Sequence, residues 1–179
     1  MIPLPKPVSS AVSGGFAQPQ ITWSRVAYGR RCEVKQNQQV VGTLQKPSFW
    51  STNYLADSTG GHWLFRRAGF LCSGAEILDA ATEQPIAQFK SDWGNGGTLT
   101  FSDGQTFLVK SSGWWRPVWM VTESGRPVVQ VRIREMTVEL DASAAANDGR
   151  VSLLILFTLY RMLQAEEDAA SAVLVAAIS

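Results

Sequence analysis

Apolar and polar residues alternate with a period of two along most of the chain, a pattern that predicts a series of β-strands. The clearest example, Thr98 to Val109, alternates on both sides of Asp103-Gly104, a residue pair typical of tight hairpin turns. Together the segments predict roughly ten to twelve strands. The other hairpins are Cys32 to Leu44, Ala75 to Phe89 and Val118 to Ile133, and further strands are predicted at Ile21 to Tyr28, His62 to Phe70 and Met136 to Leu140.

A different pattern follows the strands, because Val151 to Leu163 reads VSLLILFTLYRML and is apolar on every face of a helix. Such a helix must be surrounded by protein or by lipid. A membrane span needs about 20 mostly apolar residues, whereas this run is shorter and contains Arg161. The pattern therefore favours a helix buried in the core over one that crosses a membrane.

The bounds of this helix are predicted at residues 149–165, a length of roughly 25 Å at about 1.5 Å per residue. Asn147 or Asp148 is a suitable N-cap, because both side chains accept hydrogen bonds from free backbone amides. Acidic residues are unfavourable at the negative end of a helix dipole. We therefore expect a break near Glu166, with Glu167 and Asp168 starting a second short helix, and the pattern leaves Ala172–Ile178 open as helix, strand or tail.

Strands and helix together predict the fold class. A barrel of about eight strands is filled by its own side chains, and enclosing a helix takes about eleven or more. The chain is thus expected to be mainly β (α+β), a closed antiparallel β-barrel of about twelve strands around a central hydrophobic C-terminal helix. Residues 21–179 would form one domain, and residues 1–20, rich in Pro, Ser and Gly, a flexible arm without signal-peptide features.

Composition narrows the partners and the compartment. The 179 residues carry a formal net charge of +1, which exerts no general attraction on nucleic acid. Cys32 and Cys72 have neither metal-ligand spacing nor a disulfide framework, so both are expected to be buried thiols. These features favour a cytoplasmic protein without a cofactor and without a nucleic-acid partner.

Five basic residues form the candidate ligand-binding set: Arg66, Arg67, Lys90, Arg132 and Arg134. Guanidinium groups match the geometry of phosphate oxygens, so these residues could line a site for a lipid headgroup. Arg132 and Arg134 would share one face of a strand by the period of two. The alternative is that all five lie on ordinary solvated strand faces.

Other candidate chemistry is sparse. Glu139, Asp141 and Asp148 offer oxygen ligands of the kind that calcium prefers, but the loop between them has few further ligands, so we expect no metal site and a helix cap instead. His62 is the only histidine and has no recognisable nucleophile context. We therefore expect that the protein is not an enzyme. The tryptophans could form a ligand platform or belong to the barrel core and rim: Trp93, Trp114, Trp115 and Trp119.

Two segments resemble a known family. Glu76 to Trp93 is similar to a hairpin of phospholipid scramblases and LURP-one-related proteins, and Thr137 to Leu163 is similar in layout to their last strand, acidic loop and terminal helix. Both groups belong to the Tubby C-terminal-like superfamily, and the resemblance covers about Ile21 to Leu163. It implies a twelve-stranded barrel around a central helix. It implies no shared chemistry, because Tubby domains bind phosphoinositides and scramblases are linked to calcium-dependent lipid movement.

The function expected from these observations is a non-enzymatic binding or scaffold module of unknown ligand, for which a phosphoinositide-like lipid headgroup is one candidate. An alternative is a membrane-associated lipid-handling protein of scramblase type. The expected partners are anionic lipid headgroups or another protein, at a cytoplasmic location that includes the membrane periphery. The sequence specifies neither the ligand nor the oligomeric state.

Overall fold

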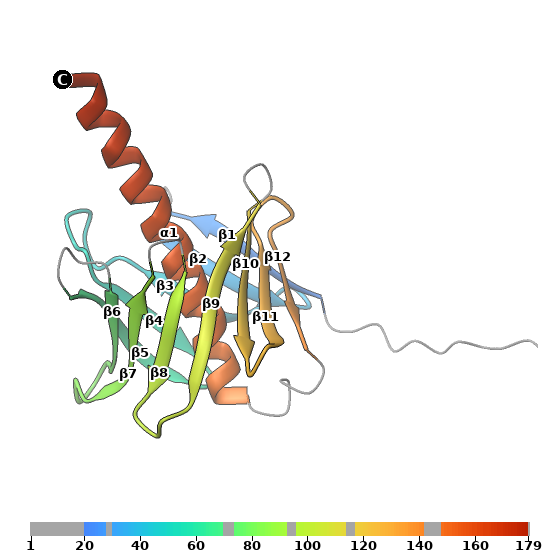
Figure 1. Ribbon diagram of the computed structural model, residues 1–179. Coiled ribbons are helices and arrows are strands. Elements are labelled where there is room, and N and C mark those ends of the chain that lie inside the picture. Colours follow the sequence, from blue (N-terminus) through green and yellow to red (C-terminus); the bar gives the residue numbers. More distant parts are fainter. Residues whose placement is uncertain are drawn as a thin grey trace, which may run out of the picture.

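The computed structural model describes residues 20–27, 30–69, 74–92, 96–113, 117–141 and 148–178. Within these residues, twelve antiparallel strands close into a barrel around one helix, α1 (Asp148–Ile178), as the sequence predicts (Figure 1). The strands are β1 (Ile21–Val26), β2 (Arg31–Gln36), β3 (Gln39–Gln45), β4 (Tyr54–Ser58), β5 (Gly61–Ala68), β6 (Gly74–Asp79), β7 (Pro85–Ser91), β8 (Gly97–Phe101), β9 (Thr106–Ser112), β10 (Val118–Glu123), β11 (Arg126–Arg132) and β12 (Thr137–Leu140).

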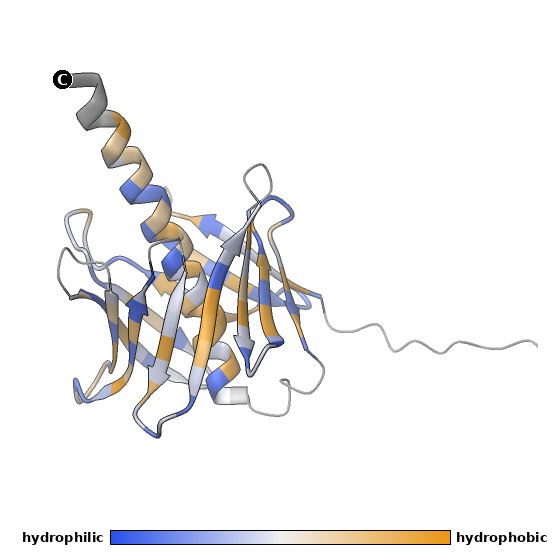
Figure 2. Ribbon diagram, viewed as in Figure 1, coloured by the Kyte–Doolittle hydropathy of each residue, from blue (hydrophilic) through white to orange (hydrophobic). Residues whose placement is uncertain are grey.

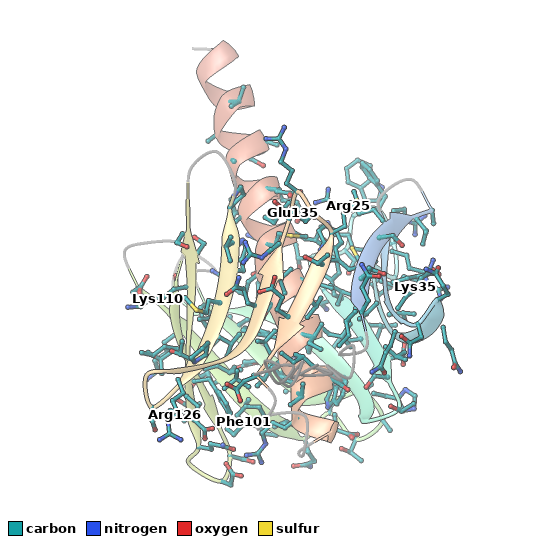
Figure 3. The ribbon with its side chains drawn as sticks, turned by 90° about the vertical axis from the view of Figure 1, so that its right-hand side faces the viewer. Arg25, Lys35, Phe101, Lys110, Arg126 and Glu135 are labelled. Atoms are coloured by element: carbon teal, nitrogen blue, oxygen red, sulfur yellow. The ribbon has the colours of Figure 1, made fainter. Side chains whose placement is uncertain are left out.

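Each strand pairs with its neighbours in sequence, and β1 pairs with β12 to close the barrel. The period of two places alternate side chains inside, as in β5, where Trp63 and Phe65 are buried and Arg66 is exposed. Tight hairpin turns lie at the end where α1 begins, which we name the entry end. The opposite end, where α1 leaves the barrel, is the exit end. Figure 3 shows Phe101 and Arg126 toward the entry end and Arg25 and Glu135 toward the exit end.

The buried part of α1 runs from Val151 to Gln164 and fills the barrel interior. Phe157 is fully buried, and its ring lies 5.8 Å from that of Phe65 and 5.4 Å from that of Phe89. These tilted and edge-on contacts are favourable geometries for aromatic pairs. The helix also contacts β3 and β4 on one side of the barrel and β10 and β11 on the other, which explains why it is apolar on every face.

A close approach of two glycines positions the start of α1. Gly60 lies in the β4–β5 turn, and a Cβ atom added there would come within 2.7 Å of the Gly149 Cα atom. The guanidinium of Arg150 then bonds to Asp103 in the β8–β9 turn at 2.7 Å. The helix is thus fixed at the entry end by two hairpin turns on different sides of the barrel.

The predicted hairpins are confirmed, but β4 was missed. Tyr54 and Ala56 do alternate as inward residues in this strand, with the Thr59-Gly60 turn directly after it. The segment is short and follows a region rich in Ser and Asn, so its pattern is weak without the neighbouring strand. The predicted strand from His62 to Phe70 ends at Ala68 in the described residues.

The predicted helix break near Glu166 is wrong, because α1 continues without interruption to Ile178. No second helix starts at Glu167 and Asp168, and Ala172–Ile178 is helical. The acids are tolerated because they do not lie at the helix terminus and because barrel cations contact them. Figure 2 shows hydrophilic residues where α1 leaves the barrel and more apolar residues beyond them.

Several predictions fall on residues outside the described ranges: the arm at residues 1–19, the Asn147 cap, Cys72, Trp93, Trp114 and Trp115. The helix itself begins at Asp148.

Candidate functional site

A set of ion pairs surrounds α1 at the exit end, and we name this set the collar. It joins Glu166, Glu167 and Asp168 of the helix to Arg25 of β1, Lys46 after β3 and Arg67 of β5. The closest N···O distances are 2.6 Å for Arg25–Glu166, 2.5 Å for Lys46–Glu167 and 2.8 Å for Arg67–Asp168. Two of the cations come from strands β1 and β5, and the third comes from the loop that follows β3. The collar therefore fixes the direction in which the helix leaves the barrel.

Contacts within the collar contribute to shifts in the pKa values of Tyr54 and Arg67. The Tyr54 hydroxyl donates to Glu167 at 2.8 Å, and burial together with this hydrogen bond raises the tyrosine pKa. Burial by itself would lower the pKa of Arg67, but the hydrogen bond to Asp168 and its charge outweigh that effect and raise it. Both groups thus keep their protons at neutral pH, and the collar stays formed.

Beside the collar, the β3–β4 loop exposes two aromatic rings. Phe49 is 70% exposed and Trp50 is 87% exposed, and their ring centroids lie 5.2 Å apart in an edge-to-face arrangement. The loop is held at its base, where the Lys46 amide donates to the Arg30 carbonyl oxygen at 3.0 Å. Rings held this way in water resemble the anchors by which proteins contact partners or membrane interfaces.

Exposed apolar residues concentrate at this end of the barrel. Of the seven large hydrophobic residues exposed among the described side chains, five lie at the exit end: Phe49, Trp50, Leu55, Met136 and Val173. Scattered surface hydrophobics need no explanation, but a concentration at one end is typical of an interaction surface. The adjacent aromatics in the segment KPSFW were the available sequence signal for this surface, and the sequence reasoning missed it.

Three buried polar side chains form a hydrogen-bonded cluster inside the barrel, on the entry-end side of the collar. The Arg161 guanidinium donates to the Gln164 side-chain oxygen at 2.6 Å, and the Gln164 amide donates to the Tyr160 hydroxyl at 2.5 Å. The Arg161 guanidinium carbon also lies 4.5 Å from the centroid of the Phe89 ring, a cation–π geometry. Burial lowers the pKa of Arg161, and the nearby charge of Arg67 adds to that effect.

The predicted basic residues are not brought together into one patch. Arg66 faces outward and pairs with Glu76 at 2.8 Å, whereas Arg67 faces the helix and joins the collar. Lys90 is exposed on β7, two strands away from β5 in the barrel. Arg132 lies on β11, on the other side of the barrel, and bonds to Glu139 at 2.8 Å. The set is therefore divided among several faces, and most of its charge is already paired.

The prediction that Arg132 and Arg134 share a strand face is wrong. Strand β11 ends at Arg132, and Arg134 lies in the turn that leads to β12. The period of two applies only while the chain is extended. Arg132 donates a hydrogen bond to Glu139, and this bond together with the negative charge of Glu139 raises the pKa of the partly exposed guanidinium.

The acidic residues weighed for calcium do not form a cluster. Among the described residues there is no group of three or more His, Cys, Asp or Glu side chains that could hold a metal ion. Glu139 contacts Arg132 on the outer face of the barrel. The His62 ring is exposed and bonds to Asp57 at 2.6 Å, and in the described part of the chain no hydrogen bond links it to a serine or cysteine.

Two further predicted core residues are placed by the structure. Cys32 is fully buried in β2, and burial raises the pKa of its thiol to about 11. A thiol with this pKa stays protonated and unreactive at neutral pH. Trp119 is buried in β10 as part of the core, so it offers no exposed ligand platform.

Comparisons with known proteins give no relative. No family model, curated protein or solved structure matches this chain. In the described residues, no helix combines the length and the apolar character that crossing a membrane requires.

Proposed function

We propose that the protein is a non-enzymatic binding module that docks on an anionic lipid surface with its exit end. The observation that carries the proposal is that α1 leads an uncharged apolar segment out of the barrel beside two exposed aromatic rings. Residues 169–178 contain no charged side chain, and Val173 is 70% exposed.

The dimensions support insertion into one leaflet. Ten helical residues extend about 15 Å at about 1.5 Å per residue, which is roughly half of the 30 Å hydrocarbon core. Phe49 and Trp50 lie nearer the barrel, where aromatic side chains favour the headgroup region. The helix tip and the aromatic loop would thus contact two depths of the same membrane.

Cations at the exit end supply the preference for anionic lipid. Arg30 is exposed beside the aromatic loop, and Arg134 is exposed in the β11–β12 turn. Basic residues near an anionic surface contribute roughly 1 kcal/mol each. The resemblance to the Tubby C-terminal-like superfamily, some of whose members bind phosphoinositides, is consistent with this proposal. The scramblase-type alternative has no separate observation in its favour.

Flotation with vesicles tests the proposal. Vesicles of phosphatidylcholine with phosphatidylserine should carry the protein upward, and binding should weaken with salt because exposed charges are screened. The change Phe49→Ala with Trp50→Ala should reduce binding at least tenfold, since burying one large aromatic contributes roughly 1.5–3 kcal/mol. Removing residues 174–179 should also reduce vesicle binding.

The matched control is Val40→Ala with Leu108→Ala, because both residues are exposed and apolar but lie away from the exit end. This variant should float like the parent. Absence of flotation by the parent on any anionic vesicle would contradict the proposal. A protein partner, or a second copy detected by light scattering, would then be the better occupant of the exposed apolar end.

A further inference from the structure

The buried guanidinium of Arg161 lacks an anionic partner. The residue is only 9% exposed, and its Nε atom is buried without a hydrogen-bond partner. In the described part of the chain, its one side-chain acceptor is the neutral oxygen of Gln164, and no ion pair joins it to a carboxylate. Buried charges in proteins are ordinarily paired, because removing an ion from water is costly.

The acid that could have paired with Arg161 is engaged elsewhere. Asp168 interacts electrostatically with Arg161 and favours its charged form, but the Asp168 carboxylate bonds to Arg67 at 2.8 Å. The strand register places Arg67 level with Ala75 and Phe89 on the next two strands, and Arg161 lies over the Phe89 ring. The charge of Arg67 accordingly disfavours the charged form of Arg161. Two guanidinium groups therefore share the field of one carboxylate just inside the exit end.

We propose that Arg161 and Arg67 together bind a phosphate group that enters at the exit end and displaces the Asp168 carboxylate. The pair offers donors from two planar forks, one on α1 and one on β5. A phosphate monoester has three terminal oxygens and nearly two negative charges, so it can accept from both forks at once. A carboxylate has only two oxygens and a single charge, and the Asp168 carboxylate already accepts a hydrogen bond from Arg67.

Asp168 then acts as an internal competitor for the site. While it holds Arg67, the collar is complete and the ligand site is half occupied. When a phosphate group replaces it, Asp168 is released toward solvent, where its side chain is already 62% exposed. This arrangement predicts that neutralising Asp168 strengthens phosphate binding, which a purely structural collar would not do.

Calorimetric titration of the full chain with inorganic phosphate, at ionic strength held constant with chloride, tests the proposal. The parent should bind phosphate, Asp168→Asn should bind at least threefold more tightly, and Arg161→Met should bind at least tenfold more weakly. A tenfold change corresponds to about 1.4 kcal/mol. The control is Arg66→Met, because this neighbouring arginine faces outward to Glu76, and it should bind like the parent.

Methionine keeps a long apolar stem over the Phe89 ring, so Arg161→Met should fold with at least the melting temperature of the parent. If it fails to fold, the gain expected from Asp168→Asn still decides the question. No phosphate binding by either the parent or Asp168→Asn overturns the proposal. Equal binding by the parent and by a folded Arg161→Met also overturns it.

Two further arms distinguish the source of the phosphate. If a phosphoinositide headgroup occupies the site, Arg161→Met should lose flotation on phosphoinositide vesicles but keep it on phosphatidylserine vesicles. If a soluble phosphate monoester occupies it, glycerol phosphate should bind and flotation should be unchanged. The result is independent of membrane docking, because phosphate binding would stand even if the parent floated on no vesicle.

Discussion

The two halves of α1 share one continuous helix but experience different surroundings. From Val151 to Gln164 every large side chain is buried by the barrel, and beyond Asp168 the described side chains are exposed. Both halves are mostly apolar in sequence. The comparison teaches that apolar character alone does not decide burial, since the barrel wall has a fixed height and the helix is longer than that height.

The first prediction compares one charge placed in each half. Leu156 is 1% exposed, and its side chain lies 3.4 Å from the position of a Cβ on Gly42. Leu156→Lys should abolish folding, because a buried ammonium there has no partner. Val173→Lys should change the free energy of unfolding by no more than about 0.5 kcal/mol. Thermal melts by circular dichroism measure both, and a parent-like melt for Leu156→Lys would contradict the central-helix arrangement.

A second prediction concerns Cys32, which lies inside the barrel close to Arg25 and Glu166 where the two halves meet. Its thiol pKa rises from 9.0 to about 11 on folding. Between these values the unfolded chain has released the proton while the folded protein retains it. The contribution of this thiol to the free energy of unfolding should therefore be fully present below pH 9. It should fall by roughly 2–3 kcal/mol as the pH rises through this window.

Urea unfolding across that window measures the fall, and Cys32→Ala should remove this part of the pH dependence. Burial also raises the pKa values of Tyr54 and Tyr160. The parent and Cys32→Ala should therefore share the loss of stability at high pH that these two tyrosines cause. If the free energy of unfolding of Cys32→Ala had the same pH dependence as that of the parent, the prediction that the Cys32 thiol pKa rises on folding would be contradicted. Alkylation in a Cys72→Ala background provides a second readout, since a buried thiol should react only on unfolding.

The smallest expected effect concerns the collar itself. The Arg25 and Glu166 side chains are 37% and 43% exposed, and exposed ion pairs typically contribute about 0.2–1 kcal/mol. A double-mutant cycle with Arg25→Ala and Glu166→Ala should therefore give a coupling energy within that range, lower at high salt. The pair Arg132–Glu139, which lies away from the helix, is the matched comparison. A collar coupling of several kcal/mol would mean that the ion pairs, rather than the buried half, hold α1 in place.

Much of the fold could be predicted from the sequence because its signals are local. Alternation around Asp103-Gly104 or Ser124-Gly125 is set by neighbouring residues and by turn geometry, and both hairpins form where they were expected. The apolar run of α1 is also a local pattern, and it predicts that the helix is surrounded by strands because all of its faces are apolar. The short strand β4 escaped prediction because its few alternating residues are convincing only beside β3 and β5.

The sequence by itself determined eleven of the twelve described strands, the buried half of the helix and therefore the barrel. Only the tertiary structure decided that α1 continues past Glu166, that Arg66 faces outward while Arg67 faces the helix, and that Arg161 is buried inside the barrel. Arg25 and Glu166 are separated by 141 positions in the chain, and no local pattern encodes such a contact. The physical reason is that backbone preference acts over a few residues, whereas charge pairing depends on which surfaces closure of the barrel brings together.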